Sequence, residues 1–130
     1  MKDFLRSIPA VTFVALLAVG ASIQSSAAAR QSASAFDGEW SVMIYTESGD
    51  CPQSLRYGVR VWNGRVLSED QNYQVSGAVS PSGATQVMVS EGGRSAGGSG
   101  KLSGNQGWGR WRTYSGGQCA GQWRAERRAY

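Results

Sequence analysis

The stretch LRYGVRVWNGRVLSE, residues 55–69, decides the fold class of this 130-residue chain. Its apolar side chains fall on alternate positions from Leu55 to Val61, as they do along a β-strand with one buried face. The alternation stops at Asn63-Gly64 and then resumes, and Asn-Gly between two alternating segments is the strongest short signal of a β-hairpin. The stretch therefore predicts two antiparallel strands joined by a tight turn.

Similar segments follow one another along the rest of the chain from residue 36 onward. Residues 92–104 are rich in glycine and serine, which fits either a weak strand or a disordered linker, and we favour the strand. With that choice, eight short strands recur roughly every ten residues, which is the spacing of an all-β meander. The six segments outside the hairpin are residues 39–46, 73–79, 84–91, 92–104, 107–114 and 119–128.

The only two cysteines, Cys51 and Cys119, indicate how the meander closes. An even count in an exported chain predicts one disulfide, with two free thiols as the alternative. The two residues lie near the end of the first strand and the start of the last, so these strands must be antiparallel neighbours. We therefore expect a small eight-stranded antiparallel up-and-down barrel, with a β-sandwich as the alternative.

The N-terminus has the pattern of a secretory signal peptide. Lys2 and Arg6 precede a short apolar run, and small residues follow it. We expect a signal peptide over residues 1–29, cleaved after Ala29 or, as the alternative, after Ala35, and the run is short for a membrane anchor. A flexible lead over residues 30–36 and a single barrel domain over residues 37–130 would then be periplasmic or secreted.

Positive charge is concentrated in the last third of the chain. From Gly92 to Tyr130 there are seven lysines and arginines against the single acid Glu126. Nearly all of these cations are arginines, whose planar guanidinium suits bidentate contacts with carboxylate, sulfate or phosphate. The alternative is that arginine serves only solubility.

The tripeptide Gly-x-Trp occurs three times and places Trp40, Trp111 and Trp123 in the inward phase of their strands. Three indoles beside small glycines are expected to form a core. The alternative is a floor of rings for a ligand in the barrel mouth.

A Gly-x-Trp at the start of the first strand of a small barrel, with arginines on the last strand, resembles the calycin pattern of lipocalins, avidins and periplasmic metalloprotease inhibitors. The resemblance implies that Arg124 or Arg127 packs across Trp40. It also implies a binding or inhibitory role, although the inhibitor family places its two cysteines much closer together than Cys51 and Cys119. The whole chain resembles small exported proteins common in alphaproteobacteria, which implies export and no particular activity.

The outward phase of residues 107–114 is rich in rings and guanidinium groups. Such side chains can stack on sugars or pair with anions, and the alternative is that they simply pack on one another. In a barrel whose last two strands lie beside the first two, one surface is expected to carry the ligand-binding candidates Trp108, Arg110, Arg112, Tyr114, Arg124, Arg56, Arg60 and Trp62. The expected partners are an anionic polysaccharide or lipopolysaccharide, or a secreted protease.

Catalysis has few candidate groups, because the chain contains no histidine. Ser-His and Cys-His pairs and imidazole metal sites are therefore excluded. The neighbouring acids Glu69 and Asp70 fall in a turn, where solvation explains them. We expect a monomeric, non-catalytic binding module without cofactor, metal or nucleic-acid partner, with a protease inhibitor or a structural envelope protein as alternatives.

Overall fold

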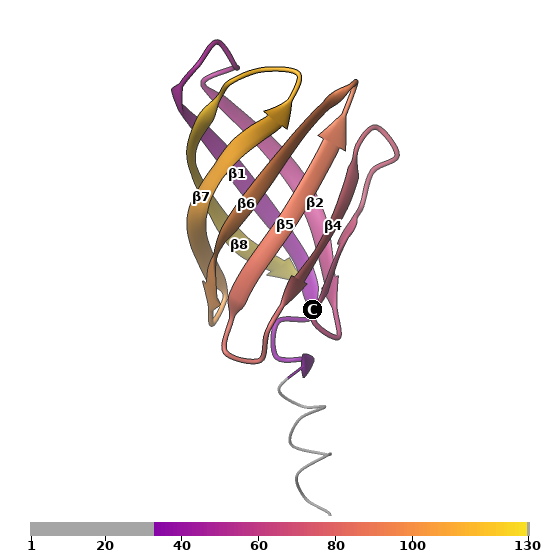
Figure 1. Ribbon diagram of the computed structural model, residues 1–130. Coiled ribbons are helices and arrows are strands. Elements are labelled where there is room, and N and C mark those ends of the chain that lie inside the picture. The colour runs from indigo at the N-terminus through magenta and orange to yellow at the C-terminus, as the bar shows by residue number, and fades with distance from the viewer. Residues whose placement is uncertain (1–32, 130) are drawn as a thin grey trace, which may run out of the picture.

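The computed structural model describes residues 33–129, so the predicted signal peptide lies outside the described residues. Eight antiparallel strands close into a barrel in which each strand pairs with the next and the last pairs with the first (Figure 1). The predicted barrel is thereby confirmed, and the sandwich alternative is wrong. No helix within these residues is long and apolar enough to cross a membrane. The strands are β1 (Gly38–Ser48), β2 (Ser54–Trp62), β3 (Arg65–Ser68), β4 (Gln74–Val79), β5 (Ala84–Glu91), β6 (Arg94–Ser103), β7 (Gln106–Ser115) and β8 (Ala120–Ala129).

The predicted hairpin joins β2 to β3. Asn63 and Gly64 both have positive φ, 48° and 77°, which is the conformation of a type I′ turn. The Asn63 N–H donates to Asp37 Oδ1 at 2.7 Å, so the turn is also tied to the segment that leads into β1.

The glycine-rich segment forms β6, as predicted, and its glycines lie beneath a ring. A Cβ added to Gly100 would lie 2.7 Å from Trp123 Cζ2, and one added to Gly109 on β7 would lie 2.5 Å from Trp123 Cε2. The indole of Trp123 thus rests on a patch of the inner wall that carries no side chains. Glycine is required here because of this close approach.

One end of the barrel is closed by the start of β1 and the end of β8. Trp40 is 1% exposed, and its indole N–H donates to the Phe36 carbonyl at 2.8 Å. The guanidinium carbon of Arg127 lies 5.1 Å from the centre of the Trp40 ring, and the same side chain donates to the carbonyls of Asp37 and Gly104. The arginine across Trp40 is therefore Arg127. Phe36, at the end of the predicted flexible lead, is buried in the core.

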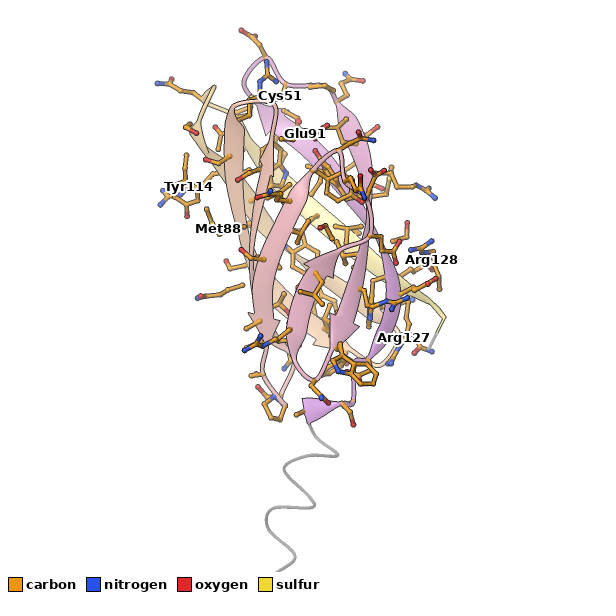
Figure 2. All side chains as sticks on the ribbon, turned by 90° about the vertical axis from the view of Figure 1, so that its right-hand side faces the viewer. Cys51, Met88, Glu91, Tyr114, Arg127 and Arg128 are labelled. Atoms are coloured by element: carbon orange, nitrogen blue, oxygen red, sulfur yellow. A yellow bond between two sulfur atoms is a disulfide. The ribbon has the colours of Figure 1, made fainter. Side chains whose placement is uncertain are left out.

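The disulfide lies at the opposite end. Cys51 and Cys119 are bonded, with their Cα atoms 6.1 Å apart, as predicted. The bond ties the β1–β2 loop to the segment that enters β8. Figure 2 shows Cys51 and Glu91 at this end of the barrel and Arg127 near the other.

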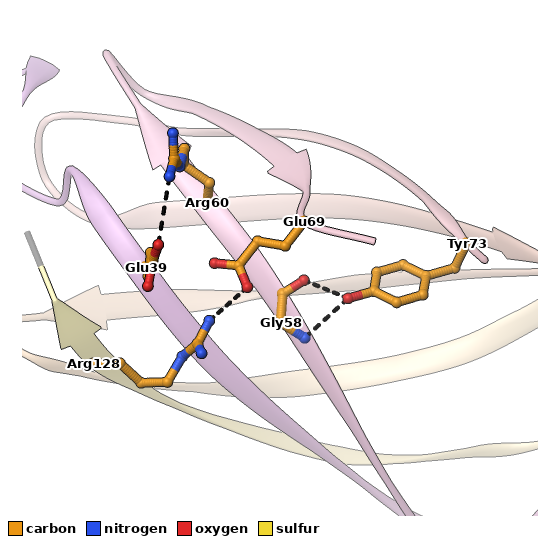
Figure 3. Close-up of polar contacts among 6 residues, drawn as sticks. All are labelled: Glu39, Gly58, Arg60, Glu69, Tyr73 and Arg128. Carbon is orange, nitrogen blue, oxygen red and sulfur yellow. Dashed lines mark hydrogen bonds and ion pairs between the residues drawn. The ribbon is translucent and has the colours of Figure 1, made fainter. Parts of the chain in front are cut away.

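The wall between β2 and β4 is completed by side chains, because β3 spans only four residues. The Tyr73 hydroxyl accepts the N–H of Gly58 at 3.1 Å and donates to the carbonyl of Gly58 at 2.6 Å (Figure 3). Outside Gly58, Glu69 of the β3–β4 loop pairs with Arg128 of β8 at 2.6 Å. A loop and a ring therefore bridge the place where the strand ladder is short.

Candidate functional site

The interior of the barrel contains an apolar cavity of about 450 Å³, whose lining runs from Cys51 and Glu91 at the disulfide end to Trp40 at the closed end. The lining is least exposed toward the closed end, where Val61, Val66 and Leu102 are each less than 5% exposed. In the mouth half, inward-facing side chains remain partly exposed to the interior. These are Val42, Ile44, Leu55, Tyr57, Val87, Val89 and Ala96.

Trp111 and Trp123 line one side of the cavity and offer it only carbon. The indole N–H of Trp111 donates to the Tyr45 carbonyl at 3.0 Å, and that of Trp123 donates to the Ser99 carbonyl at 3.2 Å. Because backbone acceptors already occupy both groups, the rings present apolar faces rather than hydrogen-bond donors. The predicted core of indoles is confirmed, and two of its members also line a cavity.

The rim of the cavity is held by covalent and hydrogen-bonded links between loops. Besides the disulfide, the Cys51 N–H lies 3.2 Å from Cys119 Sγ, and the Thr46 hydroxyl donates to the Pro52 carbonyl at 2.6 Å. The Thr113 hydroxyl accepts the Cys119 N–H at 2.9 Å and donates to the Gly117 carbonyl at 2.8 Å. The mouth therefore has a fixed outline where the β1–β2 and β7–β8 loops meet.

Charged groups reach the cavity only at its rim. Glu91 and Arg94 face each other in the register of β5 and β6, at the hairpin that borders the mouth. The Tyr57 hydroxyl donates to Glu91 Oε2 at 2.9 Å, and its ring meets the Tyr73 ring edge-on with centroids 5.0 Å apart. Burial, followed by the hydrogen bond to Glu91, raises the pKa of Tyr57 to about 12. Tyr57 thus stays a neutral donor at any physiological pH.

The predicted outer candidates are exposed, and part of the set is contiguous. Trp108 is 47% exposed while Trp111 is 9% exposed, so the predicted phase of β7 is confirmed. Trp108 lies directly opposite Arg124, and a shallow hollow on the outer wall is lined by Trp108, Gly109, Arg110, Gln122 and Arg124. Arg56 lies in the same cross-strand row as Arg124, with Met43 between them.

Four other candidates lie apart from this hollow. The guanidinium of Arg112 stacks on Tyr114 at 5.1 Å near the mouth end of β7. Arg60 pairs with Glu39 at 3.4 Å, and Trp62 lies opposite Arg65 beside the turn at the closed end. These four residues form two separate groups, one toward each end of the barrel.

Two features of the site were missed from the sequence. The Glu47 carboxylate accepts hydrogen bonds from Arg110 Nη2 at 2.7 Å and from Gln122 Nε2 at 2.8 Å. Both bonds lower the pKa of Glu47, and the bond from Gln122 has the larger effect. Glu47 thereby neutralises one cation of the predicted face. The cavity was also missed, and its only signal is that the inward residues of 87–98 are small: Val87, Val89, Ala96 and Gly98.

Comparisons with known proteins identify no relative. No family model matches the chain, and neither a curated protein nor a solved structure matches it. The calycin resemblance therefore stays a prediction. Among residues 33–129, no three His, Cys, Asp or Glu side chains gather where they could hold a metal ion.

Proposed function

We propose that this protein is a non-catalytic binding module that holds one small, uncharged apolar molecule inside its barrel. The observation that carries the proposal is the cavity of about 450 Å³, whose apolar lining is left partly exposed. Ligand pockets are typically about 300–1,000 Å³ and mostly apolar. An eight-stranded barrel is wide enough either to be filled by its own side chains or to enclose one small ligand.

The lining selects against charged and strongly polar ligands. Glu91 and Arg94 are the charged side chains along the described lining, and both lie at the rim. Deeper inside, the Thr85 hydroxyl already donates to the Gly83 carbonyl at 2.9 Å. A polar ligand group placed at the deep end of the cavity would lose its hydrogen bonds to water without gaining a hydrogen-bond partner in the protein. This costs about 1–3 kcal/mol for a neutral group.

The disulfide supports a place of action in an oxidising compartment. Bonds such as Cys51–Cys119 persist in secreted and periplasmic proteins and are rare where thiols are kept reduced. Export is thus part of the proposal, together with cleavage of the N-terminal segment.

The test is uptake of Nile red, an uncharged apolar dye whose fluorescence rises in apolar surroundings. Val89 lines the cavity and Ser90 points outward from the same strand, so the same indole can be added inside or outside. We expect Val89→Trp to weaken dye binding by at least about tenfold, or about 1.4 kcal/mol, and Ser90→Trp to leave it unchanged. Thermal unfolding of both variants shows whether the barrel is intact.

Two results would contradict the proposal. One is absence of dye binding by the folded wild-type protein, which would favour a structural role. The other is equal binding by the wild type and a stably folded Val89→Trp variant, because the dye would then sit on the outer surface.

A further inference from the structure

The register of the barrel places five outward-facing side chains in one row. From β6 to β2 the row runs Lys101, Trp108, Arg124, Met43 and Arg56, and each residue is the direct cross-strand partner of the next. All except Met43 are exposed. We call this set the cationic row. Cations therefore alternate with an aromatic or thioether side chain on consecutive strands.

The cations of this row have no opposite charge bound to them. The ion pairs among the described residues are Arg60–Glu39, Arg110–Glu47 and Arg128–Glu69, and none involves Lys101, Arg124 or Arg56. The opposite side of the barrel is different, because the outward residues of β4 and β5 are all uncharged. They are Gln74, Ser76, Ala78, Ala84, Gln86, Met88 and Ser90. Cations outside these ion pairs therefore lie on β6, β8 and β2, and the outward positions of β4 and β5 carry none.

The spacing of the row is set by the sheet. Neighbouring strands lie about 4.8 Å apart, so cations on every second strand are about 10 Å apart at the backbone. Two pyranose rings in an extended polysaccharide span a comparable length. A chain with one acidic group per disaccharide would therefore space its charges by about the distance that separates Lys101, Arg124 and Arg56 at the backbone.

The apolar members suit the sugar rings between those charges. Trp108 stands beside Arg124 at the edge of the shallow hollow, where Gly109 adds no side chain. An indole face can stack on the C–H face of a pyranose ring, and a guanidinium can hold a carboxylate or sulfate by two parallel hydrogen bonds. The hollow supplies both kinds of contact within one pair of strands.

We propose that the cationic row binds an acidic polysaccharide that carries one carboxylate or sulfate per disaccharide. A sugar ring stacks on Trp108 and its acidic group pairs with Arg124. The long side chains of Lys101 and Arg56 reach the next acidic groups from either side of the curved wall. This site shares no residue with the lining of the cavity and does not depend on the proposed function.

The experiment uses hyaluronan oligosaccharides, which carry one carboxylate per disaccharide, and follows binding by calorimetry at low salt. Trp108→Ala is matched by Trp62→Ala, an exposed indole outside the row, and Arg124→Gln is matched by Arg65→Gln. We expect each row variant to weaken binding by at least about tenfold and each control by less than about twofold. Uptake of Nile red should be unchanged in all four, which separates this site from the cavity.

Two comparisons decide whether the occupant is a polysaccharide. Neutral dextran should not bind, and vesicles of anionic phospholipid should bind weakly and respond equally to Arg124→Gln and Arg65→Gln. Equal losses in row and control variants with hyaluronan would overturn the proposal, since binding would then be diffuse attraction. Tighter binding to the vesicles than to hyaluronan, lost with Trp108→Ala, would overturn it in favour of a membrane surface.

Discussion

The two halves of this barrel are built from the same strands but are filled differently. On β1, Trp40 is almost fully buried at the closed end, whereas Ile44, two inward positions further on, is partly exposed to the cavity. At the closed end a large ring, Leu102 and the cap of Arg127 occupy the interior. At the mouth, valines and Ala96 line the cavity and remain partly exposed. Alternation therefore decides which side chains face inward, and their size decides whether the interior is a core or a site.

The largest expected effect is on the stability of the closed half. Trp40→Ala removes a buried ring together with its Arg127 stack and its hydrogen bond, so we expect a loss of about 4–5 kcal/mol in the free energy of unfolding. Trp111→Ala should cost less, about 3 kcal/mol, because that ring is 9% exposed and carries no stacked guanidinium. Urea unfolding of both variants gives the two values. Equal costs would mean that the halves are packed equally well.

Loss of the disulfide should act on the mouth. In the chain-entropy model, a bond that closes a loop of 68 residues contributes about 4 kcal/mol. Cys51→Ala combined with Cys119→Ala should lower the unfolding free energy by up to that amount. Hydrogen exchange should then quicken in the β1–β2 and β7–β8 loops more than at the Asn63-Gly64 turn. Uniform quickening would show that the two ends unfold as one unit.

The sharpest comparison makes the same change in each half. Val61 is 2% exposed among closed-end side chains, and Val89 lines the cavity. We expect Val61→Ala to cost about 2 kcal/mol and Val89→Ala less than about 1 kcal/mol, because Val61 is almost fully buried whereas Val89 is already partly exposed. Urea denaturation of both variants, fitted with one common m-value, measures the difference in unfolding free energy. A larger cost at Val89 would reverse the assignment of the halves.

The smallest expected effect is a pH dependence at the mouth. The Tyr57 pKa is raised from 10.0 to about 12 in the folded protein, so the neutral phenol is favoured by folding. The contribution of Tyr57 to the free energy of unfolding is fully present below pH 10, and it is lost as the pH rises through about 12. Tyr57→Phe should reduce the fall in melting temperature over this range, measured by thermal unfolding at a series of pH values. Tyr73, whose pKa burial also raises, accounts for a remaining part.

Much of the fold could be predicted because it depends on local order in the sequence. The alternation from Leu55 to Val61 and the Asn63-Gly64 turn act within a few residues, and the Cys51–Cys119 pair selects closure. The sequence also predicts which side chains of β7 face inward, because shifting the strand by one residue would bury Arg110 and Arg112.

The site could be predicted only in part, because it depends on register around the whole barrel. Whether Val87 meets a ring or empty space across the interior is decided by strand tilt and not by its neighbours in sequence. The same holds outside, where Glu47 reaches Arg110 from a distant part of the chain. The outer candidates also spread around the barrel, which is why Trp62 on β2 lies far from Trp108 on β7, with β8 and β1 between them, although both face outward.

The seam between β1 and β8 has a consequence for how the chain acquires its shape. It joins the first strand to the last, and Arg127 reaches Trp40 only across this seam. Until the final strand is present, both β1 and β7 have a free edge, and pairing of segments so distant in sequence is slow because the intervening chain must first be ordered. A chain whose β8 has not yet been synthesised therefore remains an open sheet, and closure of the barrel waits for residues Ala120–Ala129.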